Sequence, residues 1–323
     1  MAGRTILFIS KGSESPSTRY RALNYFDRLR GADWNPVHIA APRGVFDRMR
    51  VLKAVRSADV VVNLRKTWAA PFRRVLRRAA KRLVFDFDDA VFVDDDGSES
   101  PTRMRRFAAM VGSCDQVWAG NSYLAETAAK YNEHVTVLPT SIDPDRYIVD
   151  AEKPTGAIDV VWIGGSATRK YLEAVMPALE AFGASVDMRL KIIADFDLRS
   201  TLRTLPIRWS PEIETVELAS SHIGIAPMND DAWTRGKCGL KVLQYLAARL
   251  PVVVTDTGVH REMIQDGQTG FLVRDDQQWM DALTRLARDS DLRRSLGDQG
   301  RTCVVGKYAI ESTAKKMIDL LDR

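Results

Sequence analysis

Long apolar runs, paired cysteines and low-complexity tracts are missing from this sequence, and each absence excludes a class of protein. No apolar run approaches the roughly 18 residues that a membrane-spanning helix needs. A strand-like segment, 5–10, lies where a signal peptide would have its apolar core, so we expect no secretion signal. Three widely spaced cysteines, Cys114, Cys238 and Cys303, indicate neither a disulfide framework nor a zinc site. We therefore expect a cytoplasmic protein.

Several catalytic motifs are missing as well. The four histidines have no metal-ligand spacing, and neither a Gly-x-Ser-x-Gly turn nor a Cys/His pair occurs. The first strand is followed by a serine-rich loop, 11–17, rather than by the Gly-x-Gly-x-x-Gly turn of dinucleotide-binding proteins. An NAD-dependent oxidoreductase is therefore disfavoured.

The length and composition fit two globular domains. The chain has 323 residues, 45% of them hydrophobic, and one domain takes about 150 residues. The net charge of +5 is uneven: residues 1–150 carry 24 Lys/Arg and 18 Asp/Glu (24 − 18 = +6), and the remainder carries 23 and 24 (23 − 24 = −1). A basic first half favours an anionic partner such as a membrane surface, a lipid phosphate or nucleic acid.

Strand-like and helix-like segments alternate in both halves, which predicts an α/β protein with parallel sheets. A polar segment with Pro and Gly, 150–156, reads as a linker. We therefore predict an N-terminal Rossmann-like domain, 1–152, and a C-terminal Rossmann-like domain, 153–323, with the last helix as a candidate to cross back to the first domain. The segment 20–29 is predicted to be one helix.

The most informative stretch is 223–273. A buried strand and a polar loop lead to a basic turn, Arg235–Gly239, from which a helix, 240–248, starts directly. Backbone N–H groups and the positive end of a helix dipole favour an anionic ligand at such a start. A second stretch, 160–175, has a strand, the turn Gly164–Ser166 and a helix whose first turn carries Lys170. A plain turn with a solvated lysine remains an alternative there.

These stretches resemble the nucleotide-sugar half of retaining glycosyltransferases of the GT-B fold, the family 4 or group 1 class. Residues 258–273 resemble the family's closing signature, with matches at Gly258, Glu262, Gly267, Gly270 and Phe271. The resemblance implies the GT-B fold, in which two Rossmann-like domains have parallel sheets that face each other across a cleft. It also implies a nucleoside-diphosphate sugar donor on the C-terminal domain, an acceptor on the N-terminal domain, no metal and no other cofactor, and no nucleic acid as a partner.

The sequence departs from the family pattern at three positions. Gly164 and Lys170 keep the spacing of the family's Gly-Arg…Lys segment, but Gly165 stands where the arginine would be. Gly236 and Gln244 stand at the two positions of the family's Glu-x7-Glu motif, which is therefore degraded. The cations of the basic turn and its helix can replace the missing arginine at the diphosphate, although a basic solvated face remains an alternative.

Candidate site residues follow from the motifs and the resemblance. The C-terminal set is predicted to bind the donor, two carboxylates and two lysines are candidates for catalysis, and two arginines of the first loop are candidates for acceptor binding. The donor set is Gly164, Gly165, Ser166, Trp209, Arg235, Lys237, Gly239, Gln244 and Glu262; the catalytic set is Asp88, Asp89, Lys170 and Lys241; the acceptor set is Arg19 and Arg21.

Structural roles remain open for several of these residues. The two carboxylates can cap the next helix or pair with arginines, and one of the two arginines can pair with an acid on the surface. Trp209 can flank a nucleotide base or lie in the core, and Glu262 can be a surface glutamate. A helical segment, 72–83, has a stripe of cations that suits an anionic membrane surface without insertion, or is simply solvated. The stripe is Arg73, Arg74, Arg77, Arg78, Lys81 and Arg82.

The sequence therefore predicts a retaining glycosyltransferase. It would move a sugar from a nucleoside-diphosphate sugar to a hydroxyl of a cell-envelope glycan or a lipid-linked acceptor, in the cytoplasm, peripherally at the inner face of the membrane. Two alternatives stay open: a nucleotide-sugar epimerase, which the lost carboxylates disfavour, and a catalytically degenerate binding or scaffold subunit, which they favour.

Overall fold

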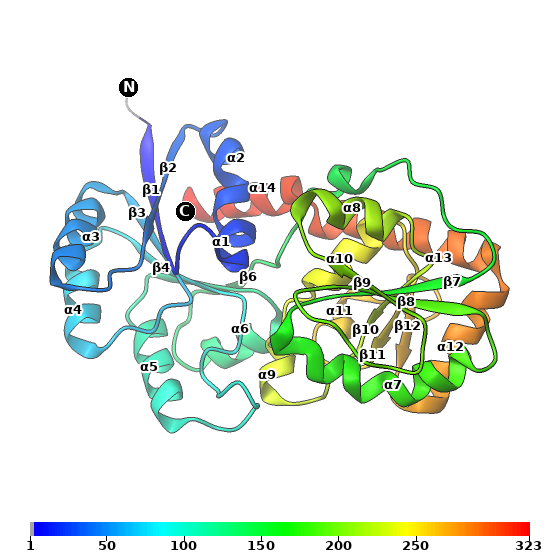
Figure 1. Ribbon diagram of the computed structural model, residues 1–323. Helices are drawn as coiled ribbons and strands as arrows, with labels where there is room; N and C mark the ends of the chain where they lie inside the picture. The colour runs from blue at the N-terminus through cyan, green and yellow to red at the C-terminus, as the bar shows by residue number, and fades with distance from the viewer. Residues whose placement is uncertain (1–2) are drawn as a thin grey trace. The chain divides into compact units, whose positions relative to one another are not determined.

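The computed structural model describes residues 3–323 and contains two six-stranded parallel sheets (Figure 1). Its residue contacts divide the chain into two compact units. The first unit comprises Met1–Ser141, Asp231–Cys238 and Ile310–Arg323, and the second comprises Ile142–Asp230 and Gly239–Ala309. No helix within residues 3–323 combines the length and the apolar content needed to cross a membrane.

The sheet of the first unit has the strand order β2-β1-β3-β4-β5-β6. The order reverses between β1 and β3, so the crevice at their carboxyl ends is the expected place for a ligand. The elements of this unit are β1 (Arg4–Ser10), α1 (Pro16–Arg21), the 3₁₀ turn η1 (Leu23–Tyr25), α2 (Phe26–Arg30), β2 (Trp34–Ala40), α3 (Val45–Ser57), β3 (Val60–Leu64), α4 (Ala70–Ala79), β4 (Leu83–Phe87), α5 (Pro101–Val111), β5 (Gln116–Ala119), α6 (Ser122–Ala129), β6 (Val135–Val137), α9 (Ala232–Arg235) and α14 (Ile310–Leu321).

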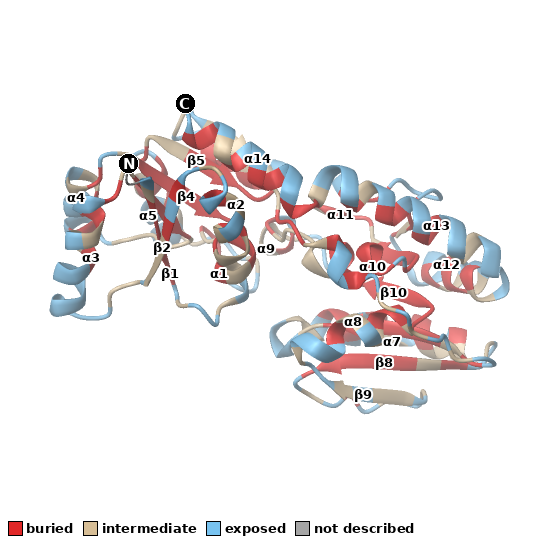
Figure 2. Ribbon diagram, turned by 90° about the horizontal axis from the view of Figure 1, so that it is seen from above, coloured by how far each residue is buried: buried red, intermediate tan, exposed pale blue. Residues whose placement is uncertain are grey.

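Helices cover both faces of this sheet, because alternate side chains of each strand point to opposite faces. Leu7 and Ile9 of β1 join the core under α3, α4, α5 and α6. Ile6 and Phe8 join a second core, to which α14 contributes Met317. β3 and β4 are buried along their whole length, as is typical of central parallel strands. β4 is labelled in Figure 2 and is red there.

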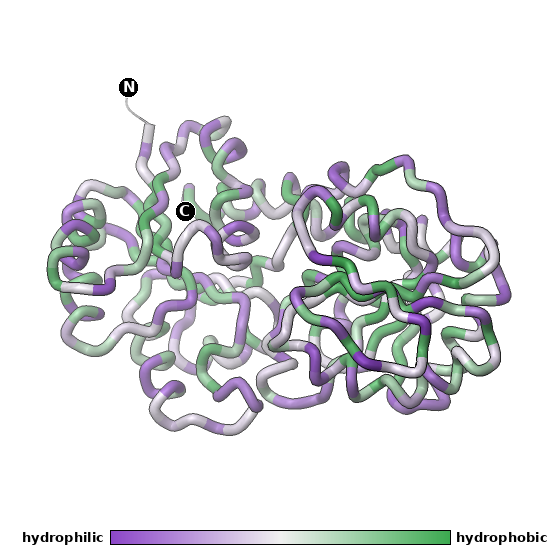
Figure 3. The backbone as a smooth tube through the Cα atoms, viewed as in Figure 1, coloured by the Kyte–Doolittle hydropathy of each residue, from purple (hydrophilic) through white to green (hydrophobic). Residues whose placement is uncertain are grey.

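The sheet of the second unit has the order β12-β11-β10-β7-β8-β9, which is the strand order of dinucleotide-binding domains, and reverses between β7 and β10. Hydrophobic residues, green in Figure 3, concentrate in its strands. Its elements are η2 (Pro144–Tyr147), β7 (Ile158–Ile163), η3 (Ser166–Thr168), α7 (Arg169–Gly183), β8 (Met188–Ala194), β9 (Thr204–Arg208), α8 (Pro211–Ala219), β10 (Ile223–Ala226), α10 (Leu240–Ala247), β11 (Val252–Thr255), α11 (His260–Met263), β12 (Phe271–Val273), α12 (Asp276–Arg288), α13 (Ser290–Cys303) and the π turn η4 (Val304–Tyr308).

The α/β class and the two parallel sheets agree with the prediction from the sequence, but two segments differ from it. The predicted helix 20–29 is broken into α1, η1 and α2, because Ala22 has a non-helical backbone (φ −136°, ψ −67°). A single border near residue 153 also does not describe the division into units, because the segment Asp231–Cys238 belongs to the first unit. This segment is called the excursion below. Trp233 and Cys238 pack there against the first unit's core, a contact between segments far apart in the sequence.

Candidate functional site

The glycine turn after β7 and the first turn of α10 meet in the second unit, where the strand order reverses. Lys241 Nζ donates to Thr168 Oγ1 over 3.1 Å and lies 4.2 Å from the centroid of the Trp162 ring. A Cβ atom at Gly164 would lie 2.6 Å from Lys241 Nζ and 2.4 Å from the Trp162 ring. Only glycine at this position therefore lets the ammonium group lie against the turn.

Gly239 ends the approach to α10 in a left-handed conformation. Its φ is +65°, and a Cβ atom there would lie 2.4 Å from Met263 Sδ. Glycine meets both requirements, because it has no side chain and adopts positive φ without strain. The chain can thus turn sharply into α10. Lys241 is the second residue of this helix, so it belongs to the first turn, whose backbone N–H groups have no partner within the helix.

A cavity of about 260 Å³ lies at the carboxyl ends of β8 and β9 in the same unit. Its lining includes Asp195, Phe196 and Arg208. Asp195 Oδ1 accepts hydrogen bonds from the N–H and the hydroxyl of Ser166, both over 3.1 Å. The predicted donor residue Ser166 is therefore tied to the wall of this cavity.

The other predicted residues of the second unit have different surroundings. Trp209 is 40% exposed, so it is not a core tryptophan, and its Nε1 donates to Glu214 over 2.7 Å. Gln244 is buried on α10, whereas Glu262 is exposed on α11. Lys170 is exposed at the start of α7, with its Nζ 5.1 Å from the centroid of the Tyr171 ring.

Two residues predicted to bind the donor in the C-terminal domain, Arg235 and Lys237, belong to the first unit. Lys237 Nζ lies 3.0 and 3.2 Å from the carboxylate oxygens of Asp89, and 3.3 Å from the centroid of the Trp233 ring. Asn121 Nδ2 donates to the carbonyl oxygens of both basic residues, over 3.0 and 2.9 Å. Burial lowers the pKa of Lys237, although the attraction of Asp89 opposes this. The charge of Lys237 is therefore balanced within the first unit.

The degraded glutamate position, Gly236, has a steric explanation. A Cβ atom at this residue would lie 2.5 Å from Ala90 Cβ and 2.7 Å from Ala90 N. A glutamate cannot replace this glycine without moving the backbone of the first unit. The missing carboxylate is thus linked to the packing of the excursion Asp231–Cys238.

One of the two predicted acceptor arginines has a structural role instead. Arg21 is 1% exposed; it forms a salt bridge with Asp86 and donates to the carbonyl oxygen of Leu138 over 2.6 Å. Burial opposes the charged form, but the attraction of Asp86 outweighs it and raises the pKa of Arg21. The acid partner is thus internal, and Arg21 is not accessible to an acceptor. Arg19 lies half-buried on α1.

The two candidate catalytic carboxylates differ in their partners. Asp89 pairs with both Lys237 and Arg65. Asp88 Oδ1 is buried without a hydrogen bond among the described residues, and it forms a longer ion pair with Arg65 Nε, 3.5 Å away. A buried polar oxygen without a donor is rare in folded proteins and marks a place where a ligand can donate.

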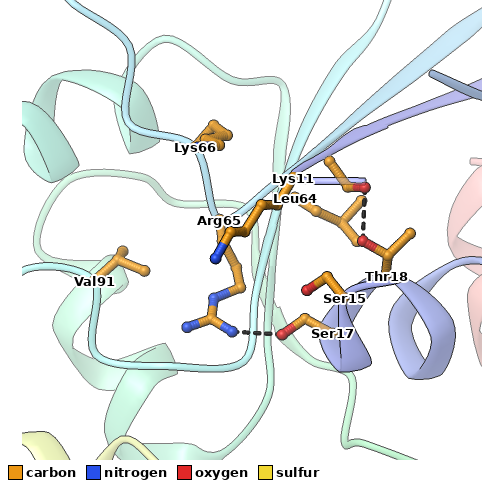
Figure 4. A pocket seen from close by; sticks show the side chains of 9 residues that line it. Lys11, Ser15, Ser17, Thr18, Leu64, Arg65, Lys66 and Val91 are labelled. Carbon is orange, nitrogen blue, oxygen red and sulfur yellow. Dashed lines mark hydrogen bonds between the residues drawn. The ribbon is translucent and has the colours of Figure 1, made fainter. Parts of the chain in front are cut away.

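A cavity of about 270 Å³ lies where the strand order of the first unit reverses (Figure 4). Its lining has three cations and four hydroxyl groups but no carboxylate: Ser10, Lys11, Ser15, Ser17, Thr18, Leu64, Arg65, Lys66 and Val91. Arg65 has a left-handed backbone (φ +57°) and donates to Ser17 Oγ. Strained non-glycine residues are frequent at binding sites.

Sequence reasoning missed Lys11, Arg65 and Lys66. The available signal was their position, because all three follow directly on buried strands, β1 and β3, at the carboxyl edge of a parallel sheet. The cavity therefore takes its cations from two loops that are more than fifty residues apart in the sequence.

The predicted basic stripe on α4 and its C-terminal extension is only partly open. Arg77 pairs with Asp115 and Lys81 with Asp59, and Arg82 donates to carbonyl oxygens at the end of α14. Arg74 and Arg78 are exposed. Within residues 3–323 no group of three or more His, Cys, Asp or Glu side chains is arranged to hold a metal ion.

Each unit has a doubly wound α/β fold, and the fold of the chain matches solved structures of the GT-B class. Within this class, residues 158–289 match the family of group 1 glycosyl transferases. The chain therefore resembles group 1, or family 4, glycosyltransferases over residues 158–289, and its fold is of the GT-B type.

Two curated proteins and one solved structure illustrate the relationship. The chain is 31% identical to a putative glycosyltransferase, EpsD, of Bacillus subtilis over 30% of its length and 26% of the relative. It is 26% identical to a GDP-mannose-dependent α-(1-6)-phosphatidylinositol monomannoside mannosyltransferase of Mycobacterium tuberculosis over 57% of its length and 54% of the relative. The chain thus spans about half or less of these relatives. HepE of Anabaena, solved with UDP and glucose, shares the fold (TM-score 0.75, 14% identity, 99% of both chains).

Proposed function

We propose that this protein is a retaining glycosyltransferase. It would move a sugar from a nucleoside-diphosphate sugar, held by the second unit, to a hydroxyl of a cell-envelope glycan or lipid-linked acceptor, held by the first. The observation that carries the proposal is the contact of Lys241 with the Gly164 turn at the strand-order reversal of a group 1 domain.

The chemistry of the donor fits this arrangement. Transfer forms a bond from the acceptor oxygen to the anomeric carbon and breaks the bond from that carbon to the diphosphate, which leaves with the electron pair. Lys241 and Lys170 would neutralise the leaving group, so that the protein itself supplies the positive charge without a metal ion. The cavity at Asp195, Phe196 and Arg208 would take the nucleoside.

The cavity of the first unit supports an acceptor with a phosphate or carboxylate group. Lys11 and Lys66 line it beside serine hydroxyls, and no carboxylate shares the lining. Cations and hydroxyl groups together bind phosphate oxygens through charge-assisted hydrogen bonds. The phosphatidylinositol acceptor in the name of the mycobacterial relative has such a group.

Asp88 is the carboxylate best suited to contact the acceptor hydroxyl. Its side chain is partly exposed and its Oδ1 makes no hydrogen bond, so the carboxylate can take the hydroxyl proton, whereas both oxygens of Asp89 are held by cations. A positioned carboxylate orients the hydroxyl and takes its proton as the new bond forms.

A lipid-linked acceptor also requires the enzyme to reach a membrane. We propose a cytoplasmic protein that associates peripherally with the inner face of the membrane. The exposed Arg74 and Arg78 of α4 are suited to anionic lipid head groups.

A panel of nucleoside-diphosphate sugars tests the proposal by thermal shift and by release of the nucleoside diphosphate. One donor should stabilise the wild type and be turned over, and both effects should be lost in Lys241→Ala but kept in Lys316→Ala, which removes an exposed lysine of α14. Stabilisation without turnover, with or without acceptors, would support a second candidate function, a degenerate binding subunit. The glycines at the Gly165 and Gly236 positions favour that candidate.

A further inference from the structure

The first two turns of α3 in the first unit expose apolar side chains that the core does not use. Phe46 is 83% exposed, Val45 68% and Met49 56%, and they are among the most exposed large apolar residues of the described chain. The opposite side of the helix buries Val51 and Val55 in the core. The tip of α3 is therefore apolar on its outer side as well as on its inner side.

The three exposed apolar residues share one side of the helix, because side chains three and four positions apart are neighbours. The same spacing continues from Met49 to Lys53 and Arg56, both of which are exposed. The outer side of α3 thus changes from apolar at its N-terminus to basic at its C-terminus. Figure 2 shows the exposed turns of α3 in pale blue.

Charge around the tip has one predominant sign. From residue 43 to residue 56 there are five cations, Arg43, Arg48, Arg50, Lys53 and Arg56, and one acid, Asp47. α4 packs beside α3, with the Arg48 guanidinium 5.5 Å from the centroid of the Phe72 ring. It adds the exposed cations Arg74 and Arg78.

The tip lies at the same sheet edge as the basic cavity. Ala41, four residues before α3, donates its N–H to the carbonyl oxygen of Ser10 over 2.6 Å, and Ser10 lines the cavity. α3 follows β2, and β2 is parallel to β1 and β3, so all three strands end at the same edge of the sheet. The start of α3, with Val45 and Phe46, is therefore near the edge at which Lys11 and Arg65 lie.

We propose that the tip of α3 inserts Val45, Phe46 and Met49 into an anionic lipid bilayer, while the cations of α3 and α4 bind the lipid head groups. This goes beyond the basic contact proposed above, which needs no insertion. An apolar patch surrounded by cations fits a membrane interface, because the apolar side chains enter the acyl boundary and the cations lie at head-group level. A bilayer at this edge would bring a lipid-linked acceptor to the basic cavity.

Vesicle binding tests the proposal without any need for sugar transfer. Wild-type protein should bind phosphatidylcholine vesicles that contain phosphatidylglycerol. It should bind vesicles of phosphatidylcholine alone much more weakly. The double variant Phe46→Ser/Met49→Ser should bind roughly tenfold or more weakly, because two apolar side chains are lost from the bilayer. The matched control is Val216→Ser/Val305→Ser, which removes two exposed apolar residues of the second unit and should bind like the wild type.

Two further variants separate insertion from charge. Phe46→Trp should show fluorescence quenching by brominated lipids beyond that of the wild type, because the new indole enters the acyl region. Lys53→Glu/Arg56→Glu should weaken binding more than Lys315→Glu/Lys316→Glu, which changes the net charge equally on the exposed side of α14.

Equal binding by Phe46→Ser/Met49→Ser and the wild type would overturn insertion, as would equal binding to neutral and anionic vesicles. Absence of vesicle binding, together with a dimer that Phe46→Ser/Met49→Ser abolishes, would assign the tip to a second copy of the chain instead. Thermal shift with the nucleoside-diphosphate sugar panel on the same preparations separates this proposal from the proposed function. Donor stabilisation without vesicle binding overturns only the membrane insertion.

Discussion

Positive charge lies at the strand-order reversal of both units, but different kinds of residues supply it. In the second unit, glycine at position 164 lets one lysine, Lys241, lie against the turn that follows β7. In the first unit, side-chain cations from two loops line a cavity, and Arg65 adopts a left-handed backbone to join them. A backbone turn suits a diphosphate that every donor shares, whereas side-chain cations suit an acceptor-specific anion.

Loss of the Lys241 ammonium should have the largest effect. In Lys241→Ala we expect kcat for sugar transfer to fall by about 10²–10³-fold, as for the loss of one preorganised charge at a leaving group. Steady-state kinetics with the donor identified by the panel measure this, with Lys316→Ala as the control. A kcat within a factor of about two of the wild type would contradict a role at the diphosphate.

The two acidic residues after β4 should separate catalysis from stability. Asp88→Asn should lower transfer by roughly 10²-fold, while donor hydrolysis by water is kept, because the acceptor hydroxyl loses the carboxylate that takes its proton. Asp89→Asn should instead lower the midpoint of thermal unfolding, because Arg65 and Lys237 lose a shared carboxylate. If both variants changed transfer and unfolding equally, Asp88 and Asp89 would not have the different roles that their ion pairs indicate.

Acid should act on the second unit through its buried histidines. Burial lowers the pKa values of His222 and His260 to about 4, and the positive charge of Lys153 adds to this at His222. A histidine that stays neutral in the fold contributes full stability above its ordinary pKa near 6.5, and this contribution is lost as the pH falls toward 4. For His260 the loss is about 3 kcal/mol.

Thermal unfolding measured between pH 7 and pH 4.5 checks this pH dependence. His260→Gln removes the titrating group, so its unfolding midpoint should fall less steeply with acid than that of the wild type. His134→Gln, at an exposed histidine of the first unit, is the control. Identical slopes for wild type and His260→Gln would exclude His260 as a source of acid sensitivity.

Adjacent glycines provide a matched test of the close approach in the second unit. Gly164→Ala places a methyl group 2.4 Å from Trp162 and 2.6 Å from Lys241 Nζ, whereas the nearest atom to a methyl group at Gly165 is 4.0 Å away. We expect Gly164→Ala to weaken donor binding roughly tenfold through overpacking, and Gly165→Ala to leave it nearly unchanged. Titration calorimetry measures both, and equal affinities would mean that the ligand does not use this turn.

We expect the smallest effect on the binding of an anion to the basic cavity of the first unit. Glycerol 3-phosphate should bind the wild type, and glycerol should not. Lys66→Ala and Lys11→Ala should each weaken this binding roughly tenfold, because a charge-assisted hydrogen bond is lost. Ligand-observed NMR measures the affinities, with the exposed Lys130→Ala as the control. Binding that does not depend on either lysine would remove the cavity as an anion site.

The two units also differ in how much of them the sequence predicts. The glycine turns of the second unit and the basic start of α10 follow from contiguous motifs, because local spacing dictates them. The excursion of Asp231–Cys238 into the first unit depends on Trp233, Asn121 and Asp89, which are far apart in the sequence. The sequence therefore could not predict that Lys237 packs in the first unit.

In the first unit, sequence reasoning chose charged residues by type rather than by position. The sequence predicts Arg21 at the start of a helix beside a serine-rich loop, which favours an acceptor residue. In the structure Arg21 is the last residue of α1 and pairs with a buried acid, Asp86. Lys11 and Lys66 lie outside every recognisable motif, and only the order β2-β1-β3 brings them to one crevice. Sequence spacing cannot predict which strand pairs with which, so this site needs the structure.

Amide hydrogen exchange with each ligand tests the central claim, that the two reversals bind different substrates. A nucleoside diphosphate, UDP or GDP, should slow exchange at residues 164–170 and 239–243 and leave 10–18 and 64–66 unchanged. Glycerol 3-phosphate should give the opposite pattern. Protection of 10–18 and 64–66 by the nucleoside diphosphate, without protection at 164–170 and 239–243, would contradict the account.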